Sequence, residues 1–273
     1  MTQTPTGPAA DGTGQLDEAY QRLHATGPEF DGWLSNHGPM GAEAIVRHGH
    51  AAELGPWLDG YITRLEEFPR GLGPIGGGWR DALGDPRRIA DWTGYFRAEL
   101  AGQPWREVLG TWWPRLLPGV VAALPAPGTP EETRATLTAL VDAATLSYLR
   151  YGHGNPVMLV HAATAPNAVL RVLPVLDPAL WAPSLTAAWA ASSALTAIYA
   201  PAGAAPEAPR TPGGGRPSGL AGVDEAASMF ARAVEHGDAH VVKFADTALD
   251  VFGRTGNPDA LAAAHQAADL IDR

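Results

Sequence analysis

The chain has 273 residues with 29 acidic side chains, 19 lysines and arginines, and no cysteine, so its formal net charge is −10. This length allows one large domain or two small ones with a sizeable core. The acidic balance argues against nucleic acid or an anionic membrane surface as the main partner. Without cysteine, disulfides and thiolate metal sites are excluded, and any metal must be held by nitrogen and oxygen.

The first fourteen residues are polar and rich in Thr, Gly and Pro. They lack the basic region and apolar core of a signal peptide, and we expect residues 1–14 to be a disordered tail. No run of about 18 apolar residues free of helix breakers is present, so no membrane-spanning helix is expected. The sequence therefore predicts a cytoplasmic enzyme or binding protein.

Apolar residues recur at helical spacing through the first half of the chain, and Gly and Pro mark the ends of the segments. We expect helices at 16–25, from Pro39 to 49, at 57–67, at 87–101, and from Pro104 until Pro114 interrupts it. Proline fits the first position of a helix, where its missing N–H is not needed. The many aromatic residues in these helices are interpreted as core packing.

The second half continues in the same way. Helices are expected at 130–150, from Pro156 onward with a disturbance at Pro166, at 176–200 as one or two helices, at 223–253, either continuous or interrupted at Gly237, and at 258–271. Residues 201–219 are almost purely Pro, Gly, Ala and Ser and predict a flexible loop. No segment shows the alternation of a strand. The sequence thus predicts an all-α fold: one compact domain, 15–273, of short helices punctuated by Gly and Pro.

One segment combines residues with metal-binding chemistry. His236, His240 and Lys243 are spaced i, i+4, i+7, which places them on one face of a continuous helix. Lys243 is the only lysine of the chain. Burial lowers the pKa of a lysine, and a neutral amine can add carbon dioxide to form a carbamate, whose oxygens resemble those of a carboxylate. Two imidazoles and a carbamate would form half of a metal site.

The alternative is that Lys243 extends to solvent and the two histidines lie on a hydrated helix face. Among the other histidines, His37 precedes a predicted helix start, and His161 lies in the middle of an apolar helix, where an unsatisfied imidazole would be costly. Imidazole and oxygen ligands suit iron, zinc, manganese or copper. No zinc-protease pattern, Gly-x-Ser-x-Gly elbow, Walker loop or dinucleotide fingerprint is present.

Several short motifs occur in the order found in the questin oxidase-like family, which the chain resembles from about residue 16 to 271. They are Asn36-His37-Gly38-Pro39-Met40, Gly152-His153-Gly154-Asn155-Pro156, the run from His161 to Ala168, and His240-Val241-Val242-Lys243-Phe244. The segments 79–84 and 112–119 are also similar to bacterial members.

This resemblance implies ring-opening, Baeyer–Villiger-like oxygenation of anthraquinone-type aromatic polyketides by a non-haem iron enzyme. Carried over by position, the iron ligands would be His37, His161, His240 and carboxylated Lys243. Four further residues of these segments are candidates for ligands or for groups that bond to ligands: His153, His236, Asn36 and Asn167. Trp33, Met40 and Trp181 are candidates for contacts with a planar substrate, and Trp189 is a further aromatic candidate.

The chain departs from the family in one place. Similar proteins carry a helix with a Thr-His-Gly motif after the Leu-Pro-Gly of residues 117–119, whereas this chain has no histidine between His50 and His153. The metal site would then be open, completed by His153 or water, or lost. The alternatives to an oxygenase are a non-catalytic helical binding protein on the same scaffold and a metal-dependent hydrolase. No nicotinamide or flavin fingerprint is visible, so an oxygenase would draw electrons from its substrate or an outside donor.

Overall fold

The computed structural model describes residues 12–30, 34–116, 128–205 and 220–272. Nearly all regular structure in these ranges is helical, which confirms the all-α prediction. The chain forms two compact units, Met1–Pro69 and Arg70–Arg273, so the region predicted as one domain contains both. Most of the predicted N-terminal tail and most of the predicted loop at 201–219 lie outside the described residues.

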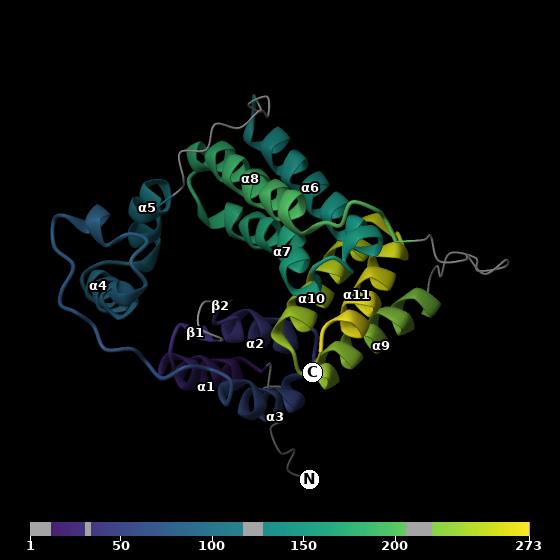
Figure 1. Cartoon of the computed structure of the whole chain (residues 1–273), viewed down its shortest axis with the longest axis horizontal. Coiled ribbons are helices and arrows are strands. Elements are labelled where there is room, and N and C mark those ends of the chain that lie inside the picture. The colour runs from purple at the N-terminus through teal and green to yellow at the C-terminus, as the bar shows by residue number, and fades with distance from the viewer. Residues whose placement is uncertain (1–11, 31–33, 117–127, 206–219, 273) are drawn as a thin grey trace, which may run out of the picture. The chain divides into compact units, whose positions relative to one another are not determined.

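The first unit contains α1 (Thr13–His24), α2 (Gly38–Arg47) and α3 (Ala51–Ile62) (Figure 1). Its core includes Leu23, Ile45, Leu58 and Tyr61. Between α1 and α2, the two-residue strands β1 (Glu29–Phe30) and β2 (Leu34–Ser35) pair antiparallel, a short ribbon that the sequence pattern did not predict. The helix expected at 57–67 instead spans Ala51–Ile62, so it begins and ends earlier than predicted and contains Pro56.

The second unit begins with two 3₁₀ turns and two short helices. Their bounds are η1 (Trp79–Ala82), η2 (Pro86–Arg88), α4 (Ile89–Gly102) and α5 (Trp105–Leu116). Helix α5 continues through Pro114, where an interruption was expected. Asp91, on α4, is buried and accepts hydrogen bonds from the backbone N–H groups of Leu72 and Gly73, which anchors the preceding Gly/Pro-rich loop.

The remaining helices of this unit form its main core. They are α6 (Pro130–Tyr151), α7 (Pro156–Val172), η3 (Leu173–Val175), η4 (Pro178–Leu180), α8 (Trp181–Tyr199), α9 (Leu220–His236), α10 (Ala239–Thr255) and α11 (Asp259–Leu270) (Figure 1). The predicted starts at Pro130 and Pro156 are confirmed. Thr129 and Glu132 form a capping box, and the Asn155 side chain accepts from the N–H of Met158.

Helix α7 packs against α6, α8 and α10. Residues Pro156–Val175 are long and apolar enough to span a membrane by length and composition alone. However, α7 also carries the polar residues His161, Thr164, Asn167 and Arg171, two of which are fully buried inside the unit. These are the features of a core helix, and Pro166, where a disturbance was expected, lies inside the helix and is buried.

The segment predicted as helical at 223–253 is two helices, with the interruption at Gly237 that the sequence left open. Gly237 adopts φ = 87°, in the left-handed region that favours glycine, and ends α9. Asp238 then caps α10. His236 therefore belongs to α9 and does not share a helix face with His240 and Lys243.

Candidate metal centre

Helix α10 is buried along its first half, from Ala239 to Ala248, because α6, α7, α9 and α11 all pack on it. Among the polar side chains that this burial encloses are His240 and Lys243, each with 2% of its surface exposed. The sequence prediction that Lys243 is a buried amine is thus supported by the structure, and the alternative of a lysine that extends to solvent is wrong.

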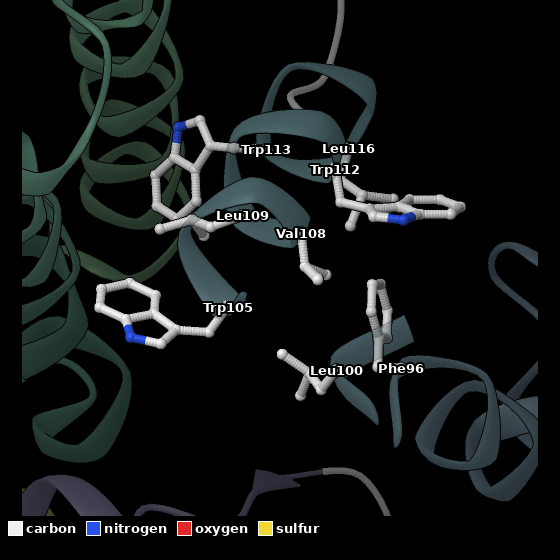
Figure 2. A pocket seen from close by; sticks show the side chains of 8 residues that line it. All are labelled: Phe96, Leu100, Trp105, Val108, Leu109, Trp112, Trp113 and Leu116. Atoms are coloured by element: carbon white, nitrogen blue, oxygen red, sulfur yellow. The ribbon is translucent and has the colours of Figure 1, made fainter. Parts of the chain in front are cut away.

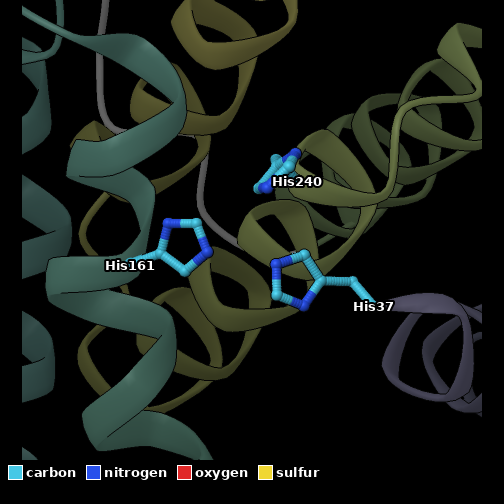
Figure 3. Close-up of side chains that lie close together, drawn as sticks. All are labelled: His37, His161 and His240. Atoms are coloured by element: carbon cyan, nitrogen blue, oxygen red, sulfur yellow. The ribbon is translucent and has the colours of Figure 1, made fainter. Parts of the chain in front are cut away.

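His161 of α7 meets both residues. Its Nε2 lies 2.8 Å from Nζ of Lys243, and the imidazole centroids of His161 and His240 are 5.1 Å apart with the rings at 69°. One ring nitrogen of each histidine lies within 4.8 Å of the other. Figure 3 shows these two imidazoles extending toward each other from α7 and α10. His161 and Lys243, which are 82 positions apart in sequence, thus lie in one cluster with His240.

The second ring nitrogen of each histidine is held by an oxygen. Nδ1 of His161 lies 2.8 Å from the carbonyl oxygen of Val157, and Nδ1 of His240 lies 3.1 Å from Oδ1 of Asp238. A carbonyl or carboxylate oxygen accepts, so the proton of each neutral imidazole resides on Nδ1. In a neutral ring held in this way, the lone pair is on Nε2. Carbonyl–histidine and carboxylate–histidine pairs are the arrangement that orients imidazoles at metal sites.

Burial also disfavours positive charge on His161 and Lys243. Desolvation, followed by the neighbouring Lys243 and His240, lowers the pKa of His161 to about 3. Desolvation lowers the pKa of Lys243 to about 7, against an opposing effect of Asp238. At neutral pH the His161 imidazole is therefore uncharged, and a large fraction of Lys243 is a free amine. Both are the forms that bind metals or carbon dioxide.

The buried amine predicts a specific pH dependence of stability. Between pH 7 and about 10 the unfolded chain binds a proton at Lys243 that the folded chain has released, so this residue makes the free energy of unfolding rise with pH. The slope approaches about 1.4 kcal/mol per pH unit for one proton. Urea denaturation of metal-free wild type and Lys243→Met should show this slope in the difference between the two proteins. A difference that is flat from pH 7 to 10 would mean that the lysine is protonated in the folded state.

A second set of polar side chains joins α7 to α10, next to the cluster of His161, His240 and Lys243. The Arg171 guanidinium bonds to carboxylates of Asp246 and Asp250, each at 2.7 Å. The Asn167 side chain donates to Thr247 and Asp250. Sequence reasoning named Asn167 but missed the others, although Asn167 and Arg171 on one helix and Asp246 and Asp250 on the other share an i, i+4 spacing. Asn167 thus links the two helices rather than contacting His161.

The other candidate residues of the second unit lie outside the cluster. His236 is buried, but its Nε2 bonds to the carbonyl oxygen of Ile271 at 2.9 Å, so it anchors the end of the chain. His153 lies exposed in the turn between α6 and α7. Trp181 packs against the apolar cluster of α6, η3 and α8, and its Nε1 donates to Leu176. These three predicted site residues have structural or surface positions.

The remaining candidates belong to the first unit. His37 is the residue before α2, its backbone N–H donates to the Tyr61 hydroxyl, and its imidazole does not cap the helix. Asn36 caps this turn, since its Oδ1 accepts from the N–H of Gly38. Met40 is exposed, and Trp33 lies outside the described residues. That His37 joins His161 and His240 in a metal site stays a prediction.

Compared with models of protein families, with curated proteins and with solved structures, the chain gives no significant match. The questin oxidase-like resemblance of the motifs stays a prediction.

Proposed function

We propose that the protein is a metal-dependent oxygenase, with non-haem iron as the metal. The support that carries the proposal is a pair of imidazoles with centroids 5.1 Å apart, whose Nδ1 atoms are fixed by oxygens, with Nε2 of His161 next to the Lys243 amine. His161, His240 and carboxylated Lys243 would hold the ion, and the sequence resemblance adds His37 as a further ligand. Two neutral imidazoles and an anionic oxygen ligand suit ferrous iron and other first-row metals.

Lys243 would enter this set as a carbamate. Its neutral amine adds one carbon dioxide, forms an N–C bond, and releases one proton. The product has a negative charge and presents oxygen, whereas the free amine offers only nitrogen. The low pKa of Lys243 favours this reaction, because the ammonium form has no lone pair to attack carbon dioxide.

Bound iron would supply the activation of dioxygen, and the chain would supply orientation and charge. Asp238 and the Val157 carbonyl would hold the imidazole rings in place, and the apolar packing around α10 would exclude water. The substrate that we propose is an electron-rich, anthraquinone-like aromatic polyketide, from the sequence resemblance. Electrons would come from the substrate or from an outside donor.

Oxygen consumption tests the proposal. Protein loaded with ferrous iron in bicarbonate buffer is expected to consume oxygen with a hydroxyanthraquinone, and the His161→Ala variant is expected to remain at the rate of buffer. The His153→Ala variant controls for the loss of an exposed histidine. Equal rates in wild type and His161→Ala would contradict the proposal. Activity with zinc in the absence of oxygen would instead indicate a hydrolase.

One observation favours the second candidate, a non-catalytic helical binding protein. The Lys243 amine already bonds to Nε2 of His161, so the pair satisfies itself without an ion. A chain that functions this way would contain no transition metal after purification and would not take up oxygen with any hydroxyanthraquinone.

A further inference from the structure

A buried chain of hydrogen bonds connects the residue after α11 to the His240 ring, and His236 lies in the middle of this chain. Nε2 of His236 lies 2.9 Å from the carbonyl oxygen of Ile271, and its Nδ1 lies 3.4 Å from the backbone nitrogen of Asp238. Oδ1 of Asp238 in turn lies 3.1 Å from Nδ1 of His240. His236, Asp238 and His240 are all buried, so little water competes for these bonds.

The donors and acceptors around His236 fix its tautomer. A carbonyl oxygen only accepts a hydrogen bond, and a backbone N–H only donates one. The neutral ring therefore carries its proton on Nε2, toward Ile271, and its lone pair on Nδ1, toward Asp238. This is the reverse of His161 and His240, whose Nδ1 atoms carry the proton. Because both ring nitrogens of His236 are occupied in this way, the residue offers no lone pair to a metal.

The bond between His236 and Asp238 spans the turn that joins α9 to α10. In this turn the backbone passes through Gly237 at φ = 87°, and glycine has the greatest conformational freedom of all residues. The bond from the Asp238 N–H to His236 restrains that freedom directly before α10. Because the Asp238 carboxylate orients the His240 ring, the position of Asp238 determines the direction of the ring's lone pair.

We propose that His236 is a positioning residue of the metal centre: its Nδ1 holds the Asp238 backbone in the place from which the Asp238 carboxylate orients His240 for metal binding. This inference rests on the proposed function, because it concerns the same metal site. Removal of groups that hold metal ligands in place typically weakens metal binding about 10–100-fold. The purely structural alternative is that His236 only attaches the chain end at Ile271 to the end of α9.

Two conservative variants separate these roles. A side-chain amide offers an acceptor oxygen and an N–H donor, and it reaches the position of Nδ1 in asparagine and that of Nε2 in glutamine. His236→Asn is therefore expected to keep the acceptor for Asp238 and lose the bond to Ile271. His236→Gln is expected to keep the bond to Ile271 and lose the acceptor. The positioning role requires that asparagine replaces histidine better than glutamine does.

Zinc titration of the metal-free full chain in bicarbonate buffer, in competition with a chelating dye, measures the difference. Zinc is a suitable probe because sites of nitrogen and oxygen bind it more tightly than ferrous iron. At the site that His161→Ala removes, His236→Gln is expected to bind zinc at least about tenfold more weakly than wild type, and His236→Asn within about threefold. Equal affinities, or weaker binding by His236→Asn than by His236→Gln, would overturn the inference while leaving the proposed function intact. A wild type that binds no zinc would contradict both.

Nitrogen NMR of the metal-free proteins gives a second readout, which needs no metal. The His240 ring is expected to show one tautomer, with the proton on Nδ1, in wild type and His236→Asn. In His236→Gln the ring is expected to exchange between its two tautomers, because the Asp238 carboxylate is no longer held beside Nδ1. A single unchanged tautomer in His236→Gln would show that His236 does not act on His240.

A control in the same unit separates positioning from a general loss of stability. Figure 2 shows Trp113 of α5 among the apolar side chains that line a pocket. Its indole N–H donates to Ser184 of α8, and no residue of the metal centre takes part in this bond. Trp113→Phe is expected to lower the free energy of unfolding and leave zinc affinity unchanged. If it weakens zinc binding as much as His236→Gln does, loss of stability explains the effect and the inference is wrong.

A third variant keeps the inference testable if His236→Gln does not fold. His236→Phe retains a ring and removes both of its hydrogen bonds. It is expected to bind zinc at least about tenfold more weakly than wild type. Zinc binding by His236→Phe as tight as that of wild type would overturn the inference.

Discussion

His161→Ala protein purified without added metal is expected to contain no transition metal above background, whereas wild type is expected to contain one ion per chain. The side chain contributes an Nε2 lone pair whose direction is fixed by the Val157 carbonyl, and alanine offers no replacement donor. His240→Ala should have the same effect, because its imidazole packs against that of His161, with the ring centroids 5.1 Å apart. Elemental analysis by plasma mass spectrometry measures this content.

The metal content of a Lys243 variant tests whether the carbamate is a ligand. Lys243→Ala is expected to lose the metal, and in wild type removal of carbon dioxide and bicarbonate before loading is expected to lower metal occupancy. Labelled bicarbonate should give a carbamate carbon signal in NMR spectra of wild type only. The matched control is His153→Ala, which removes an exposed imidazole from the turn before α7. Full metal occupancy in Lys243→Ala would exclude this residue as a ligand.

The second large effect is expected on stability. Arg171→Met should lower the free energy of unfolding by about 3–5 kcal/mol, because it leaves buried Asp246 without its cation. The methionine keeps much of the apolar stem, so the loss reports on charge rather than on packing. Urea denaturation at neutral pH measures this difference.

A surface ion pair provides the comparison. Arg22 pairs with Asp59 in the first unit, where both carry substantial exposure, and Arg22→Met is expected to change stability by less than about 1 kcal/mol. If Arg171→Met changes stability as little as Arg22→Met, the pairing between α7 and α10 does not hold these helices together. Asp246→Asn combined with Arg171→Met should recover part of the loss, because the uncompensated charge is removed.

The helices were predictable where the sequence carries local signals. Thr129 before Pro130, with Glu132 three positions after the cap, determines the start of α6 through contacts within one turn. Asn155 before Pro156 acts in the same way for α7. Pro114 and Pro166 show the opposite case, because the helices continue through both. Packing against neighbouring helices offsets the local cost of proline, and a single-sequence pattern does not contain that information.

The candidate site was predictable in its residue types and only in part in its geometry. His240 and Lys243 are one turn apart, which spacing alone indicates, and His161 was recognised because an imidazole on an apolar helix needs a partner. The break at Gly237 was not resolved, because a glycine inside a helical pattern fits either a continuous or an interrupted helix. Consequently His236 was assigned to the wrong face. The pairing of Arg171 with Asp246 depends on how α7 meets α10, which no local pattern shows.

Gly237 and Asp238 have a consequence for how the centre is assembled. Oδ1 of Asp238 accepts a hydrogen bond from the backbone N–H of His240 at 2.7 Å, and it lies 3.1 Å from Nδ1 of the His240 ring. The same Asp238 oxygen therefore holds both the first turn of α10 and the His240 ring that packs against His161. If that first turn unfolds, the His240 imidazole loses its Asp238 partner at the same time. A ligand that binds the imidazole would therefore slow hydrogen exchange of the backbone amides in the first turn of α10.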